Sequence, residues 1–342
     1  MLRRVSRSAA RSGSRSEYIG TPHQENGYIL MARTSKQLAF LGSILDDQRR
    51  IQLRQSEILD GYQQRGTSDD IIEICGDLTK LRPADSSKMV DALKLFQQPF
   101  MQAVQYTHDR DYPLQPRARL PEPMIPDRPF RDLLGQRRSL RSFAGGPLGP
   151  AELGSLLFGA VGETGRLVTG YDGDRPLTAS LRSIPSAGAL HATGIFAVIL
   201  QEGELARGVY HYDVPEHSLE FVKSIGDSEF EPLFAAFPIH PSVVDLTKAS
   251  AVFFISAKFW RARAKYGPRG YRYCLLEAGC ACQNLGLTAV GLGLAHIVLG
   301  GFYDDEVHAF LEIDGIDHAV IVGVAVGTLP AAREKESHHV EF

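Results

Sequence analysis

Hydrophobic residues recur at helical spacing through the first third of the chain. Ile44, Ile51 and Ile58 follow one another seven residues apart, and Asp46, Asp47, Arg49 and Arg50 lie off this apolar stripe. This spacing is typical of an amphipathic helix with one buried face. We therefore predict a helical extension over residues 35–112, preceded by a disordered tail over residues 1–34.

Prolines crowd the segment that follows. Six of them lie between Pro113 and Pro129. Proline fixes its own φ angle and has no backbone N–H to donate, so this density excludes a helix and a central strand. We predict a linker over residues 113–129 and place the main domain boundary there.

Beyond the linker, helical and strand patterns alternate. A helix is expected to begin at Pro150, and a second, longer one to cover residues 269–287. Strands are expected over residues 194–200, 208–212, 250–256 and 318–326. The pattern predicts an α+β domain over residues 130–330, followed by a short tail over residues 331–342.

Composition narrows the class of protein. The chain has 342 residues, 44% of them hydrophobic and 23% charged, as in soluble globular proteins. A net charge of −3 gives no overall reason to bind nucleic acid. Glycines interrupt the longest apolar stretch, residues 285–302, so no membrane span is expected. Four cysteines are too few for a disulfide framework, and a reducing cytoplasm is the expected compartment.

The densest group of polar residues follows the linker. Residues 137–143 include three arginines and two serines. Guanidinium and hydroxyl groups crowded onto one turn bind phosphate through charge-assisted hydrogen bonds. The alternative is the solvated basic end of a short helix that begins near Pro129, where the helix dipole favours positive charge.

Two further segments carry groups that a ligand site needs. Residues 184–189 form a turn of small residues whose backbone can approach a flat ligand, and Ser186 adds a donor. Lys265 and Tyr266 are neighbours in what we predict to be a partly enclosed loop, where either can serve as a general base. The alternatives are an ordinary turn and an exposed charged loop.

Two weaker signals lie in and after the long helix. Gly291 and Gly293 lack the third glycine of a dinucleotide fingerprint. Cys280 and Cys282 are separated by one residue, so on a helix their side chains point to different faces. We interpret them as small hydrophobic residues rather than a metal or redox pair.

Together and in this order, these segments resemble the SagB-type thiazoline/oxazoline dehydrogenases, a branch of the FMN-dependent nitroreductase superfamily. The resemblance runs from about residue 126 to residue 330. Its pieces are Arg-Arg-Ser-x-Arg-x-Phe at 137–143, Pro-Ser-Ala-Gly at 185–188, Gly-Val-Tyr-His-Tyr-Asp at 208–213, Lys-Tyr-Gly at 265–267, Glu-Ala-Gly at 277–279 and Gln-Asn-Leu at 283–285. After Leu190 the family often continues with an aromatic residue, where this chain has His191.

The resemblance implies a nitroreductase-like fold, with a central, mostly antiparallel sheet flanked by helices, and a homodimer with two FMN sites at the subunit interface. It assigns the phosphate and ribityl region to Arg137, Arg138, Ser139 and Arg141, and an approach from the other subunit to Pro185, Ser186, Ala187 and Gly188. It places Gln283 and Asn284 at the dimer core and Leu292 and Gly293 beside the flavin ring, and leaves Arg333 as the nearest basic residue to complete the phosphate clamp.

The implied reaction is the oxidation of azolines to azoles in a ribosomally made, post-translationally modified peptide. It removes one proton and one hydride from the ring. In this family a Lys-Tyr pair is associated with catalysis, so Lys265, Tyr266 or both would take the proton while the flavin accepts the hydride. A modified precursor peptide is the implied substrate and a cyclodehydratase the implied partner.

Three other functions stay open from the sequence. One is an NAD(P)H-dependent, nitroreductase-like oxidoreductase, and another is an oxidase of carrier-protein-bound azolines in a nonribosomal pathway. The third, from outside the enzymes, is a catalytically silent scaffold subunit of a peptide-modifying complex. The intact pair Lys265 and Tyr266 argues against the scaffold.

Overall fold

The computed structural model describes residues 75–81, 90, 94, 112–226 and 230–330. The predicted tails, most of the predicted helical extension and Arg333 lie outside these residues. None of the helices within the described ranges is long and apolar enough to cross a membrane.

A central sheet organises the described part of the chain. Its seven strands lie in the order β1-β6-β5-β4-β7-β9-β8, and each neighbouring pair is antiparallel. The strands are β1 (Arg117–Arg119), β4 (Thr193–Ile199), β5 (Gly208–Asp213), β6 (Ser218–Ser224), β7 (Ala251–Lys258), β8 (Ala295–Leu299) and β9 (His318–Gly327). The expected antiparallel sheet is thereby confirmed.

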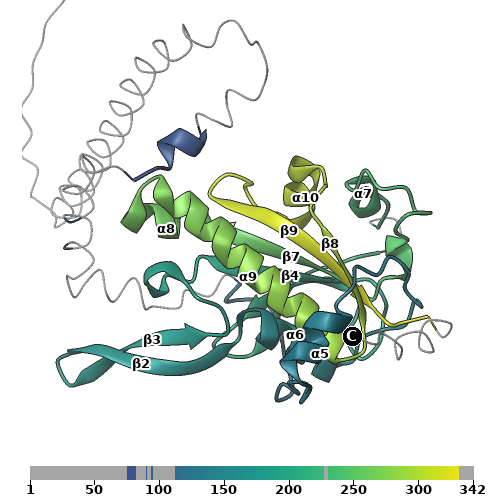
Figure 1. The fold of residues 1–342 in the computed structure, drawn as a ribbon, viewed down its shortest axis with the longest axis horizontal. Coiled ribbons are helices and arrows are strands. Elements are labelled where there is room, and N and C mark those ends of the chain that lie inside the picture. The colour runs from purple at the N-terminus through teal and green to yellow at the C-terminus, as the bar shows by residue number, and fades with distance from the viewer. Residues whose placement is uncertain (1–74, 82–89, 91–93, 95–111, 227–229, 331–342) are drawn as a thin grey trace, which may run out of the picture. The chain divides into compact units, whose positions relative to one another are not determined.

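Helices cover both faces of this sheet (Figure 1). The longer helices α6 and α9 pack on one face, and the short helices α7 and α10 pack on the other. The helices are α5 (Phe130–Gln136), α6 (Pro150–Val161), α7 (Phe230–Ala235), α8 (Phe259–Tyr266), α9 (Arg269–Gly291) and α10 (Asp304–Leu311). The result is a three-layered α+β fold.

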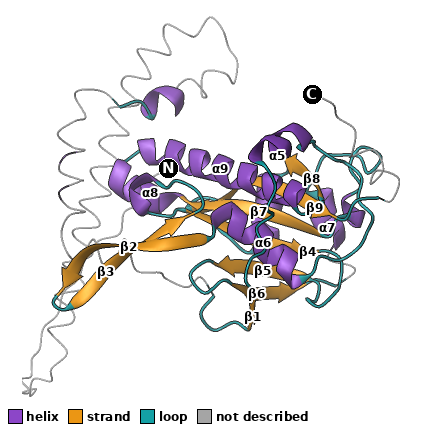
Figure 2. Ribbon diagram, turned by 60° about the horizontal axis from the view of Figure 1, so that its bottom comes forward, coloured by secondary structure: helices purple, strands orange, loops and turns teal. Residues whose placement is uncertain are grey.

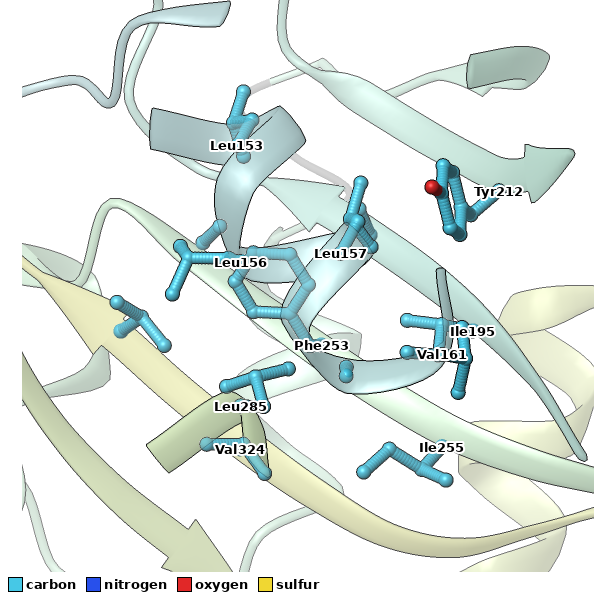
Figure 3. Packing of buried hydrophobic residues seen from close by; sticks show 14 of the residues in the cluster. Leu153, Leu156, Leu157, Val161, Ile195, Tyr212, Phe253, Ile255, Leu285 and Val324 are labelled. Carbon is cyan, nitrogen blue, oxygen red and sulfur yellow. The ribbon is translucent and has the colours of Figure 1, made fainter. Parts of the chain in front are cut away.

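The alternation of side chains along each strand explains why two helical layers are needed. In β4, Ile195 and Ala197 enter the core beneath α6 and α9, whereas Phe196 and Val198 enter the core on the opposite face. Figure 3 shows the first of these cores, where leucines of α6 meet Phe253 and the other inward side chains of the sheet. Such strands are buried on both sides, and α9 packs on one of their two faces.

The sequence anticipated the strongest elements. The helix that begins at Pro150 is α6, and the expected long helix is α9, which ends four residues later than predicted. The proline-rich linker forms the short edge strand β1, in agreement with the exclusion of a central strand.

Other elements were not anticipated. Strands β2 (Glu163–Asp172) and β3 (Arg175–Arg182) pair only with each other and form a hairpin that extends away from the main sheet (Figure 2). The hairpin leads directly into the predicted turn at residues 184–189.

The cysteines of α9 that were interpreted as small hydrophobic residues, Cys280 and Cys282, are free and pack against the core.

Candidate functional site

The N-terminal end of α9 brings two sequence-predicted segments together. Lys265 and Tyr266 do not lie in a loop, as we had expected, but form the last turn of α8. A Cβ added at Gly188 would lie 2.8 Å from the Nζ atom of Lys265 and 2.5 Å from the phenol oxygen of Tyr266. A side chain at Gly188 would displace both groups and would be strained at φ +62°, so the turn and the pair lie against each other within one chain.

The turn that carries Gly188 has an unusual backbone. Gly188 has φ +62°, and the non-glycine residues Ala189 and His191 have φ values of +52° and +49°. Left-handed conformations at such residues persist where the surroundings hold them in place. Asn284 of α9 donates a hydrogen bond to the carbonyl of Ser183 at 3.2 Å and ties the start of the turn to the helix.

Burial shifts the pKa values of Lys265 and Tyr266 in opposite directions. It lowers the pKa of Lys265, since a desolvated ammonium is unfavourable. It raises the pKa of Tyr266, and the neighbouring Tyr273 and Glu277 raise it further. Lys265 is therefore the better proton acceptor, and the Tyr266 phenol keeps its proton and can donate a hydrogen bond.

The structure adds a buried acid to this site that the sequence-based assignment had missed. Glu277 of α9 accepts hydrogen bonds from the Ser186 hydroxyl at 2.8 Å and from the Ala187 N–H at 3.1 Å. Its second oxygen accepts from the Thr193 hydroxyl at 3.3 Å. A signal was available, because Glu277 interrupts a stripe of small and apolar residues that the helical period places on the buried face of α9.

A second, more open group of predicted residues lies at the other end of α9. Arg137 follows α5 directly, and Arg138, Ser139 and Arg141 are exposed in an extended segment. The side chains are not crowded onto one helical turn, as we had expected, because this segment runs beside β8. The Leu140 N–H donates to the carbonyl of His296 at 2.9 Å.

The chemistry of this second group suits a phosphate. Burial, and then the charge of Arg137, lower the pKa of His296 to about 4, so its imidazole is neutral near pH 7. Within the described residues, Nδ1 of His296 is buried without a hydrogen-bond partner. Gly293, at φ +74°, ends the loop after α9 close by, and a side chain at that position would be strained. The arginines and the open glycine fit the phosphate end of FMN.

The two groups lie toward opposite ends of one helix. Glu277 lies beneath the turn, whereas the side chain of Arg128, just before α5, donates to the carbonyl of Val290 in the last turn of α9. A rise of 1.5 Å per residue separates Glu277 from Gly291 by about 21 Å. Between them, Gln283 is exposed on the surface of α9. Within one chain, the Gly188 turn and the arginine segment therefore lie toward opposite ends of α9.

A short segment from before the linker also reaches the N-terminal end of α9. Arg272 donates to the Thr79 hydroxyl and to the carbonyl of Gly76, both at 2.6 Å. Arg269 donates to the carbonyl of Thr79 at 3.3 Å and lies over the ring of Tyr273. Because Tyr273 packs edge-on against Tyr266, this segment is linked by contacts to the catalytic candidates.

The chain is similar in sequence to two known proteins. A protein of Methanocaldococcus jannaschii named as a nitroreductase is 31% identical over 56% of this chain and 88% of its own length. The microcin B17-processing protein McbC of Escherichia coli is 31% identical over 39% of this chain and 49% of its own length.

The fold has solved counterparts as well. A structure from Anabaena variabilis, also named as a nitroreductase, superposes with a TM-score of 0.55 at 21% identity, over 79% of this chain and 48% of that one. The chain thus spans about half the length of McbC and of the A. variabilis protein. Residues 134–328, more than half of the chain, match the pattern of the nitroreductase family. The chain belongs to the nitroreductase family.

Proposed function

We propose that this protein is an FMN-dependent dehydrogenase that oxidises azoline rings of a modified precursor peptide to azoles, as the SagB-type enzymes that its sequence resembles do. The observation that carries the proposal is the contact of Lys265 and Tyr266 with the Gly188 turn. The identity with McbC, whose name states that it processes microcin B17, supports a peptide substrate.

The chain's own groups supply the proton chemistry of this reaction. Aromatisation removes a proton from one ring carbon and a hydride from the other. The neutral amine of Lys265 accepts the proton, because burial lowers its pKa and enlarges its unprotonated fraction. The Tyr266 phenol remains protonated and orients the ring by donating a hydrogen bond. Bound FMN would supply the hydride acceptor, with dioxygen as the final oxidant.

We further propose that the protein acts as a homodimer. The half-sites at the two ends of α9 would meet when a second copy places its Gly188 turn against the arginine segment of the first. The exposed surface of α9 supports this arrangement, since Leu276 is 65% exposed and Gln283 is also exposed. Because Lys265 and Tyr266 contact Gly188, they would enter the site from the same copy as the turn.

The proposed partners follow from the proposed reaction. A cyclodehydratase would form the azolines, and the precursor peptide would carry them to this protein. We propose that the segment before the linker takes part in docking, in dimer contacts or in capture of the peptide leader. The bonds of Arg272 to Thr79 and Gly76 support a role close to the catalytic pair. The cytoplasm remains the expected compartment.

The test is the conversion of an azoline-bearing peptide by the purified, FMN-loaded protein under air. The expected product has lost two hydrogens per ring and absorbs as an azole, and no nicotinamide is needed. An unchanged peptide, with and without the cyclodehydratase, would contradict the proposal. A protein that stays colourless after added FMN would instead support a silent scaffold.

A second candidate is an NAD(P)H-dependent, nitroreductase-like oxidoreductase. It is favoured by the M. jannaschii relative, which bears that name and matches over 88% of its length. Anaerobic addition of NADPH distinguishes the two functions. Rapid bleaching of the bound flavin, followed by reduction of a quinone or nitroaromatic compound, would favour this candidate.

A further inference from the structure

The turn at Gly188, beside Lys265, is held by hydrogen bonds to one carboxylate, that of Glu277. Glu277 is 4% exposed, and one of its oxygens accepts both the Ser186 hydroxyl and the Ala187 N–H. Ser186 in turn accepts a hydrogen bond from the N–H of His191 at 2.9 Å. These bonds bracket Gly188 from both sides, so the carboxylate holds the turn where its backbone is least relaxed.

The other groups around this acid come from three elements. Thr193 of β4 donates to the second oxygen of Glu277, and Arg182 at the end of β3 contributes a positive charge. Tyr266 of α8 lies close enough for the Glu277 charge to raise its pKa. Burial is the largest influence on the Glu277 carboxyl and raises its pKa, while the three hydrogen bonds and Arg182 oppose that rise.

The position of the turn matters for Lys265 because the two are in contact. A Cβ on Gly188 would lie 2.8 Å from the Lys265 amine, so the Gly188 backbone covers one side of that amine. If the turn relaxed away from α9, water would reach the amine. Desolvation, the cause of the lowered pKa of Lys265, would then weaken.

We propose that Glu277 is a positioning residue, which fixes the Ser186–Gly188 turn over Lys265 and thereby sets the solvation and placement of the proton acceptor. The contact itself is independent of the substrate. Its effect on turnover rests on the azoline dehydrogenase function proposed above.

Two neutral substitutions separate geometry from charge. Glu277→Gln retains an oxygen that can accept from Ser186 and Ala187, and its amide can donate to the Thr193 hydroxyl, which rotates to accept. Glu277→Leu removes all three bonds. Since both variants lack the charge, a difference between them reports the position of the turn. Glu220→Gln is the matched control, because Glu220 is also buried, at 1% exposure, but bonds to Arg117 and His211 far along the sheet.

The primary measurement is the pH dependence of acetylation of Lys265, quantified by mass spectrometry of the purified, FMN-loaded protein. In Glu277→Leu we expect the apparent pKa of Lys265 to rise by about half a unit or more relative to Glu277→Gln. Glu220→Gln should match the wild type. If Glu277→Leu does not fold, two other variants should shift the same titration part of the way. Thr193→Val removes one bond to Glu277, and Ser186→Ala removes one bond to Glu277 together with the bond from the His191 N–H.

Turnover of the azoline peptide is the second readout. We expect Glu277→Leu to lower kcat by about tenfold with bound FMN retained, and Glu277→Gln to restore most of it. An inactive wild type with the expected shift in Lys265 titration would contradict the proposed function and leave the positioning role intact. Equal Lys265 titrations in Glu277→Leu and Glu277→Gln, or in the Ser186 and Thr193 variants and the wild type, would overturn the positioning role.

Discussion

The two ends of α9 differ in how their polar groups are held. At the N-terminal end, Glu277 holds the turn at Gly188 by hydrogen bonds to Ser186 and Ala187, and this turn lies against Lys265. At the C-terminal end, Arg138 and Arg141 are exposed on an extended segment. A preorganised end suits a step in which one proton must leave a defined atom, whereas an open cationic end suits the binding of a phosphate that brings its own charge.

The largest effect should come from removing the pair at the preorganised end. Lys265→Ala combined with Tyr266→Phe is expected to cut azoline turnover at least about a hundredfold, because the proton acceptor is lost, while the protein stays yellow. Absorbance of bound FMN and peptide mass spectrometry measure the two quantities. Lys248→Ala, at an exposed lysine outside both ends, is the control. Full activity of the double variant would remove the pair from the mechanism.

At the C-terminal end of α9, removing the arginines should weaken FMN binding. Arg137→Ala combined with Arg138→Ala should weaken FMN binding about a hundredfold, since each charged hydrogen bond that is lost contributes roughly a factor of ten. Quenching of flavin fluorescence gives the Kd. Arg131→Ala removes an exposed arginine of α5 as a control. Unchanged FMN affinity in the double variant would show that Arg137 and Arg138 do not bind the cofactor.

The pH dependence of turnover should be set by the protonation of Lys265. Lys265 accepts a proton only as the neutral amine, so turnover should rise about tenfold per pH unit and level off above its pKa. That pKa lies below the ordinary lysine value because of burial. Rates with FMN at saturation measure the profile. A flat profile between about pH 6 and 9 would assign the proton to another group.

A smaller effect is expected from the segment before the linker. Arg272→Ala removes two hydrogen bonds, to Thr79 and Gly76, and should lower the Tm by about 2–4 °C. Turnover should fall only a few-fold, because the effect reaches Tyr266 indirectly, from Thr79 through Arg269 and Tyr273. Arg263→Ala, at an exposed arginine of α8, controls for charge. A Tm equal to that of the wild type would mean that these bonds contribute no stability in solution.

The elements that could be predicted from the sequence are those indicated by a pattern within a short stretch of residues. The apolar period of α9 and the proline that opens α6 predicted both helices within a few residues. The hairpin β2–β3 was missed because glycines, threonines and charges interrupt its alternation. It also lacks a buried face against the main sheet that would impose a regular pattern.

The candidate site was predictable in its parts and not in its assembly. The Pro-Ser-Ala-Gly turn and the Lys-Tyr pair stand out as residue types, but nothing in their spacing indicates that Gly188 touches Lys265. Ser186 and Glu277 are 91 residues apart and meet only because the sheet fixes β4 beneath α9. Arg333 remains a prediction, since it lies outside the described residues.

One mixing experiment tests the central claim that the two ends of α9 form a site only across two copies. The Lys265→Ala, Tyr266→Phe variant and the Arg137→Ala, Arg138→Ala variant are co-expressed with different tags. They are assayed at an FMN concentration well above the wild-type Kd and well below the Kd expected for the arginine variant. Random pairing makes half of the dimers mixed, each with one intact site, so we predict about a quarter of wild-type turnover where either variant alone is nearly inactive. No recovery in purified mixed dimers would show that both ends serve the same site within one chain, and would contradict this account.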